Sequence, residues 1–266
     1  MRYELPKAST SIGNIPIGTT ELDCNGCNSL ESLVGIPSSV THLSCNGCES
    51  LTDLFGMPDS VVYFECGKCT GLTSLKGISP NVAVLNTSES SIKSFAGLSN
   101  ALEYLTCIDC AGITSLADLP NSIKMIDCSG CVRLSTLSGM PDGTIKLTCN
   151  GCYGLTNLKG IPNSVISLEC NGCLIESLEG ISESVTTIDC SACENLSSLD
   201  GLHESVLELD CSGCESLKPY LMTLLRMSRL ESLYYDYQEL IDKTVFRTKL
   251  KVIRSGHKEF ASLGDL

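Results

Sequence analysis

The chain has 266 residues, of which 42% are hydrophobic, so it is long and apolar enough to form a sizeable core and does not read as disordered. Its formal net charge of −13 argues against nucleic acid and anionic membranes as main partners. No apolar run approaches the ~18 residues that predict a membrane span. Tryptophan is absent and cysteine reaches 18 residues, so we expect an aliphatic core in which cysteine has a special role.

Residues 1–11 form the first predicted segment. They contain no apolar run and therefore do not predict a standard secretory signal peptide. The segment is also too short for a helical cap, so we expect an N-terminal flank that adds a strand to the fold. An incomplete repeat unit follows, marked by Ile12, Ile15 and Pro16.

Residues 12–217 repeat a Cys-x-x-Cys motif at a nearly fixed period. Successive pairs lie 20 or 21 residues apart, with one double step of 41 residues between Cys66 and Cys107. The double step contains a further unit in which Thr87 and Ser90 take the two cysteine positions. The full unit reads V-x-x-L-x-C-x-x-C-x-x-L-x-x-L-x-G-I-P-x-S, and ten such units are present. A fixed period of this length predicts a repeat solenoid.

Within each unit, V-x-x-L-x-C is a short alternating run bounded by turn residues, which favours one short strand. A unit of this length cannot bury its own apolar side, so stacked neighbours must supply a continuous core. The proline of the I-P-x-S segment lacks an N–H group, so we expect the return side to be irregular or extended.

This unit resembles the leucine-rich repeat, with Leu43 and Leu51 at leucine positions, Cys45 replacing a leucine and Cys48 at the conserved asparagine position. Its short period and Gly-Ile-Pro-x-Ser segment are similar to repeats of the IpaH, SspH and YopM group of bacterial effectors, and Ile-Pro-x-Ser-Val is also similar to FNIP repeats. The resemblance implies a horseshoe with a parallel β-sheet on its concave face and an irregular or extended convex side. It further implies a module that binds a host protein after secretion without a classical signal peptide.

The cysteines allow three interpretations. In the first, they are structural: the first of each pair is a small apolar core residue and the second donates a weak S–H bond to buried backbone. Thr87 and Ser90 favour this interpretation, because both are small hydrogen-bonding replacements. Disulfides are disfavoured by the odd number of pairs, so we expect a reducing cytosol. A zinc-binding or thiol-redox array is the alternative function, although we expect no cofactor.

The repeat frame also predicts which side chains face the concave surface. The position after the strand leucine is acidic in six of ten units and includes Glu65, Asp127 and Glu169, which we expect to attract positive charge. The position before that leucine is Tyr63, Val84, Tyr104 and Met125 in four consecutive units. Large apolar residues on a face expected to be wet indicate an interface.

The same units depart from the usual Asn-Gly or Ser-Gly pair between the cysteines, through Lys68 and Ile108. Two deviations in overlapping units predict the centre of a protein-binding site. The predicted site consists of Tyr63, Glu65, Lys68, Val84, Tyr104, Ile108, Met125, Asp127 and Glu169. The alternatives are a merely solvated face, or a face covered by the C-terminal segment.

Residues 218–266 break the period. Helical patterns are predicted over 219–228 and 230–241, and 245–253 is basic and amphipathic. We expect a C-terminal helical cap that closes the last repeat, followed by a basic tail. A docking or secretion signal is the alternative role for the tail.

Nothing in the sequence predicts an enzyme. None of the three histidines accompanies a nucleophile with an orienting partner. Cys107-Ile108-Asp109 matches the Cys-x-Asp of ubiquitin-ligase effectors, but it lies within a repeat, and the tail is too short for such a domain. We therefore expect a non-enzymatic monomer; a fragment of a ligase-type effector without its catalytic domain is the alternative.

Overall fold

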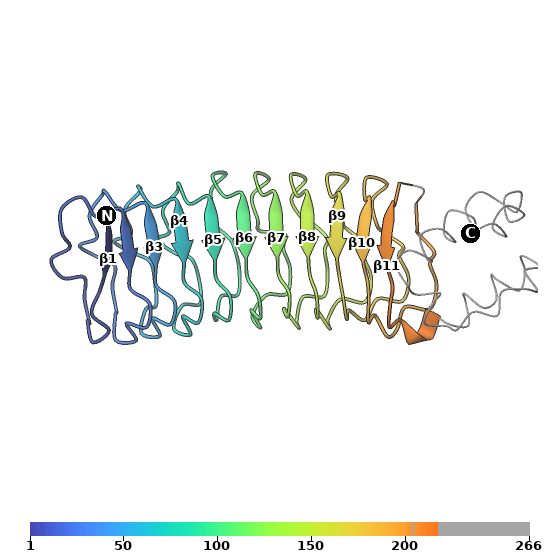
Figure 1. Cartoon of the computed structure of the whole chain (residues 1–266), viewed down its shortest axis with the longest axis horizontal. Helices are drawn as coiled ribbons and strands as arrows, with labels where there is room; N and C mark the ends of the chain where they lie inside the picture. The colour runs from blue at the N-terminus through green and yellow to red at the C-terminus, as the bar shows by residue number, and fades with distance from the viewer. Residues whose placement is uncertain (204, 218–266) are drawn as a thin grey trace, which may run out of the picture.

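The computed structural model describes residues 1–203 and 205–217, which form one parallel sheet of eleven strands in chain order. Figure 1 shows the strands standing side by side in a row along the long axis of the molecule. The strands are β1 (Arg2–Glu4), β2 (Glu21–Asp23), β3 (His42–Ser44), β4 (Tyr63–Glu65), β5 (Val84–Asn86), β6 (Tyr104–Thr106), β7 (Met125–Asp127), β8 (Lys146–Thr148), β9 (Ser167–Glu169), β10 (Thr187–Asp189) and β11 (Glu208–Asp210). This confirms the predicted repeat solenoid.

Each repeat strand is three residues long, with its central leucine, isoleucine or phenylalanine in the core. Leu43 and Phe64, for example, are fully buried and lie opposite each other in adjacent strands. Successive side chains point to opposite sides of a strand, so the two flanking residues lie on the side facing away from the core, here called the open face. Because every strand pairs in the same register, the columns read from the sequence become columns on this face.

The sheet begins inside the N-terminal flank. Strand β1 pairs with β2 so that Tyr3 lies opposite Leu22. Leu5 is buried at the position where the cysteine-containing units have their first cysteine. The Sγ of Cys27 lies 3.8 Å from the carbonyl oxygen of Leu5. The flank therefore supplies the strand half of an atypical first unit, which covers the otherwise open edge of β2.

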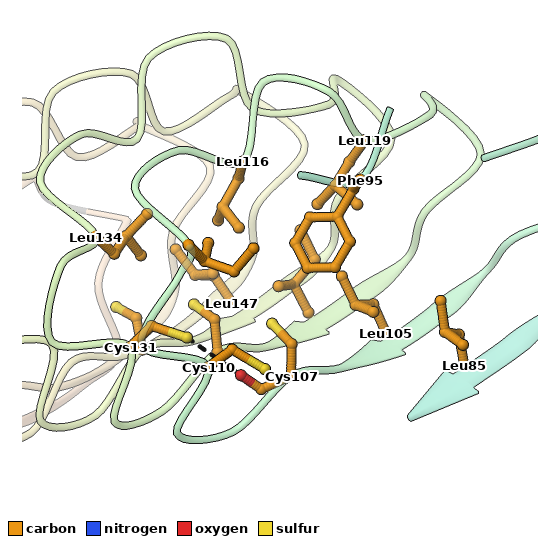
Figure 2. Packing of buried hydrophobic residues seen from close by; sticks show 14 of the residues in the cluster. Leu85, Phe95, Leu105, Cys107, Cys110, Leu116, Leu119, Cys131, Leu134 and Leu147 are labelled. Carbon is orange, nitrogen blue, oxygen red and sulfur yellow. Dashed lines mark hydrogen bonds between the residues drawn. The ribbon is translucent and has the colours of Figure 1, made fainter. Parts of the chain in front are cut away.

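The second cysteine of each pair joins its unit to the preceding one. In Figure 2 the Sγ of Cys131 donates to the carbonyl oxygen of Cys107, at 3.1 Å. The same bond, at 3.1–3.2 Å, links Cys48, Cys69, Cys152, Cys173, Cys193 and Cys214 to the first cysteine of the preceding unit. Cys110 donates instead to the Thr87 carbonyl, in the unit without cysteine. Buried carbonyls between units thus receive a donor, as the structural interpretation predicts.

All eighteen cysteines are free thiols buried in the core. Among the described residues, no group of three or more histidine, cysteine, aspartate or glutamate side chains is arranged to hold a metal ion. Leucines from the strands and return segments pack around the sulfur atoms, and Phe95 of the cysteine-free unit packs in the same core (Figure 2).

A single substitution tests the apolar role of the first cysteine column. Cys149 is fully buried, so Cys149→Ser is expected to lower the free energy of unfolding by about 1–3 kcal/mol through an added buried hydroxyl. Cys149→Ala removes the same sulfur without adding a polar group and should cost less. Urea unfolding of both variants measures the difference, and equal losses would show that the site accommodates a hydroxyl.

The return segments between the strands contain no α-helix in the described part of the chain, in agreement with the irregular convex side expected from the sequence. Residues 1–203 and 205–217 also contain no helix long and apolar enough to cross a bilayer. The last described element is a short 3-10 turn, η1 (Glu215–Leu217). The predicted C-terminal helical cap and basic tail lie outside the described residues.

Candidate functional site

Strands β4 to β7 bring four large apolar side chains together on the open face. Strand pairing places Tyr63 beside Val84, Val84 beside Tyr104, and Tyr104 beside Met125. Neighbouring strands are about 4.8 Å apart, so these side chains form a continuous row, called the apolar strip below. Tyr104 is 42% exposed and Met125 is 41% exposed, whereas Tyr63 and Val84 are half-buried.

A hydrogen-bond network fixes Glu65 at one end of the apolar strip. Its carboxylate accepts bonds from the Tyr63 hydroxyl at 2.6 Å, the Ser44 hydroxyl at 2.7 Å and the Asn46 amide at 3.1 Å. Burial opposes ionisation of Glu65, but these three donors outweigh it and hold its pKa below the usual range. The hydrogen bond between the Tyr63 hydroxyl and Glu65, together with burial, raises the pKa of Tyr63 to about 12. Glu65 is thus a fixed negative charge, and Tyr63 is held in one orientation.

The His42 ring extends the aromatic surface beyond Tyr63. The two rings stack with centroids 5.6 Å apart and an angle of 26° between their planes. The His42 ring is positioned in turn by a 2.9 Å contact between its Nδ1 and the Thr41 hydroxyl. A hollow of about 280 Å³ opens beside this stack, with Glu65 and the Arg2–Asp23 ion pair also in its lining.

Asp127 and Glu169 lie at different distances from the apolar strip. Asp127 follows Met125 on β7 and borders a hollow of about 240 Å³ that is also lined by Tyr104 and Lys146. Glu169 lies two strands further on, on β9, where it forms a 2.6 Å ion pair with Lys146. The structure therefore places Asp127 at the end of the strip and separates Glu169 from it.

Lys68 and Ile108 lie in the turns that follow the strands, beside the open face. The Nζ of Lys68 is 3.4 Å from the carboxylate of Glu89 in the next unit. The Ile108 side chain is half-buried, and its amide donates to the Ser88 hydroxyl at 3.1 Å. Both residues follow strands that carry the apolar strip, Lys68 after β4 and Ile108 after β6.

Sequence reasoning did not foresee the backbone conformation of these turns. Lys68, Glu89 and Asp109 adopt the left-handed conformation, with φ between 55° and 59°. Six equivalent positions carry glycine, and Ala192 is the remaining one. A residue with a Cβ atom in this region costs about 1–2 kcal/mol. The interrupted Asn-Gly pattern was the available signal, because it marks the units in which glycine is missing.

The Cys107-Ile108-Asp109 sequence does not form an accessible nucleophile. Cys107 is fully buried, and a hydrogen bond with the Cys131 thiol together with burial raises its pKa well above the usual value. A reactive cysteine requires an accessible thiolate, whereas this environment favours a buried thiol.

The structure resembles that of YopM from Yersinia enterocolitica WA-314, with a TM-score of 0.51 and 21% sequence identity, over 76% of this chain and 48% of that one. The chain thus spans about half the length of the YopM structure it matches. This likeness confirms the leucine-rich-repeat fold implied by the sequence motif; the similarity to FNIP repeats stays a prediction.

Two further structures match at lower TM-scores. One is YopM described as a leucine-rich effector protein from Yersinia pestis, with a TM-score of 0.45 and 18% identity over 80% of this chain and 77% of that one. The other is the leucine-rich repeat-containing protein LegL7 from Legionella pneumophila, with a TM-score of 0.34 and 17% identity over 83% of this chain and 93% of that one. No protein-family model and no curated protein sequence matches the chain.

Proposed function

We propose that this leucine-rich-repeat chain is a protein-interaction module that binds a partner protein through the open face of β4–β7. The observation that carries the proposal is the apolar strip, four large side chains in register on a face that lacks a covering layer in the described part of the chain. Exposed apolar surface bordered by charge is typical of interfaces, and tyrosine is frequent among residues that dominate binding energy.

The predicted site residues have distinct roles in this proposal. Tyr104 and Met125 are the exposed anchors, and Tyr63 is an anchor whose orientation is fixed by Glu65. Asp127 and Glu65 border the strip and favour approach of a positively charged partner. Glu169 contributes to long-range attraction rather than to the contact itself, because it is paired with Lys146 outside the strip.

We further propose that the module acts as a monomer in the reducing cytosol of a host cell, as a bacterial effector. The motif resemblance supports this setting, and the free buried thiols are compatible with it. Catalysis is not part of the proposal, because the cysteine of the Cys-x-Asp sequence is an interior packing residue.

An affinity pull-down from eukaryotic lysate with mass spectrometry tests the proposed function. Tyr104→Ala combined with Met125→Ala removes the two exposed anchors. We expect the affinity for the partner to fall by about 30-fold or more, so that the partner is no longer captured. Thermal stability should change little, because both side chains are about 40% exposed.

Tyr153→Ala is the matched control for this experiment. Tyr153 is 58% exposed in the loop after Cys152 and is not part of the open face. The control should retain every protein that the wild-type chain retains. Identical capture by the wild type and the double variant would contradict the proposal that the apolar strip is the binding site.

A further inference from the structure

The turns after the strands contain exposed charged residues in a conformation that glycine adopts more easily. Lys68, Glu89 and Asp109, here called the turn row, occupy three consecutive units, directly after β4, β5 and β6. These are three of the four strands that carry the apolar strip. Ala192 is the only other non-glycine residue with a left-handed backbone in the described chain, and it follows β10, far along the solenoid.

The fold itself gains little from the turn-row side chains. Backbone hydrogen bonds to the next unit already hold these turns. The Lys68 amide donates to the Ser88 carbonyl oxygen at 2.8 Å, and the Glu89 amide donates to the Ile108 carbonyl oxygen at 2.7 Å. The side chains project into solvent, with 65% of Lys68 and 51% of Glu89 exposed. An ion pair between such exposed groups contributes little to stability. Left-handed residues that bring no structural benefit point to a role in function.

The charge around the apolar strip indicates the kind of partner that fits. Glu65 and Asp127 border the strip on the strands, and Glu89 and Asp109 lie beyond Asn86 and Thr106, in the turns that follow β5 and β6. Lys68 is the one positive charge of the turn row, and it is already paired with Glu89. Asp109 also leans over the next turn, where a side chain on Gly130 would collide with its carboxylate. Lys146 lies beside Met125 in the register of β7 and β8, where it is paired with Glu169. A ligand seated on the strip therefore meets four carboxylates and two lysines that are each already paired with a carboxylate, so its surroundings are negative overall.

We propose that the turn row is part of the partner interface and that the strip and turn row together bind a basic peptide segment carrying a large apolar side chain. This inference rests on the proposed function, because it assumes that the apolar strip is the site of contact. The apolar side chain packs on Tyr104 and Met125, and lysine or arginine residues of the segment pair with Glu89 and Asp109. The turn row thus determines which apolar segments are accepted.

Selection from a random library of 12-residue peptides, using the immobilised full chain, tests this inference without a known partner. Enriched peptides are expected to carry net positive charge and at least one large apolar residue. Each is then measured against the wild type and the triple variant Lys68→Gly, Glu89→Gly, Asp109→Gly. The triple variant should bind at least ten-fold more weakly while its Tm stays equal or rises by about 2–4 °C, because glycine relieves the left-handed strain.

Two variants separate the possible failures. Ala192→Gly relieves the same strain outside the site and should leave peptide affinity unchanged, which isolates the side chains from the backbone effect. Enrichment of neutral or acidic peptides, or of none, would overturn the inference. If the enriched peptides lose affinity for Tyr104→Ala with Met125→Ala but not for the triple variant, only the turn row is excluded; if neither variant weakens binding, the proposed function fails as well.

Discussion

The solenoid is expected to unfold cooperatively when the pH rises from about 9 to about 10.5 under reducing conditions, because most thiols of its first cysteine column must stay protonated in the core. A hydrogen bond with a neighbouring thiol, followed by burial, raises the pKa well above its usual value in the first-column residues Cys107, Cys128, Cys149, Cys170 and Cys190. For three further thiols burial is the main cause: it raises the pKa of Cys66 and Cys211, and it raises the pKa of Cys69 to about 12.

The direction of the pH effect follows from where the protons are held. In the unfolded chain these thiols ionise near their ordinary pKa of 9.0, whereas in the folded chain they remain protonated. Above that pH the unfolded state binds fewer protons, so the free energy of unfolding falls as pH rises, by about 1.4 kcal/mol per pH unit for each such thiol. Eight thiols together give a slope on the order of 10 kcal/mol per pH unit, comparable with the whole stability of a domain.

Circular dichroism during a pH titration, with thiolate absorbance followed in parallel, checks this expectation. Hydrogen bonds with a first-column thiol lower the pKa of the second-column thiols Cys48, Cys131, Cys173 and Cys214, so these should ionise first. Thiolate from the first column should appear together with the loss of structure. The double variant Cys128→Ala, Cys149→Ala serves as the control: it starts less stable at pH 8, but the decline of its stability with pH should be shallower by about 3 kcal/mol per pH unit. An unchanged slope would assign the alkaline transition to other groups.

The repeat explains why so much of the fold could be predicted. One strand leucine per period and one cysteine pair per period fix both the register and the inward side, so Leu43 and Phe64 had to lie opposite each other. The N-terminal strand was less clear because Leu5 replaces the first cysteine and the motif is therefore incomplete there. The contact of Cys27 with the Leu5 carbonyl shows that the same packing rule continues without the motif.

The composition of the candidate site could be predicted, but its internal contacts could not. The columns containing Tyr63 and Glu65 follow from the alternation of side chains along a strand. That the Tyr63 hydroxyl donates to Glu65, and that His42 stacks on the Tyr63 ring, depends on side-chain rotamers that a residue pattern does not specify. The left-handed turns at Lys68 and Glu89 were likewise hidden, since most residues avoid this conformation and only the missing glycine marked it.

Gly56→Ala is expected to cause one of the largest losses of stability available from a single methyl group, about 3–4 kcal/mol, from left-handed strain combined with overpacking. Gly56 has a φ of +93°, and a Cβ atom there would lie 2.5 Å from the backbone nitrogen of Val34 in the preceding unit. Backbone atoms cannot move aside as the end of a side chain can, so the two units would have to separate. Because each unit is stabilised through its neighbours, this separation weakens the array at that junction.

Gly97→Ala isolates the two contributions. Gly97 holds the same position in a later unit with a φ of +91°, but a Cβ atom there meets nothing within 4 Å. Its substitution should therefore cost only the conformational part, about 1–2 kcal/mol. Chemical denaturation of both variants gives the difference, which measures how closely the return segments of consecutive repeats are packed. Equal losses would mean that left-handed strain alone explains the glycine of the Gly-Ile-Pro segment; a larger loss for Gly56→Ala shows that backbone contact between repeats also requires it.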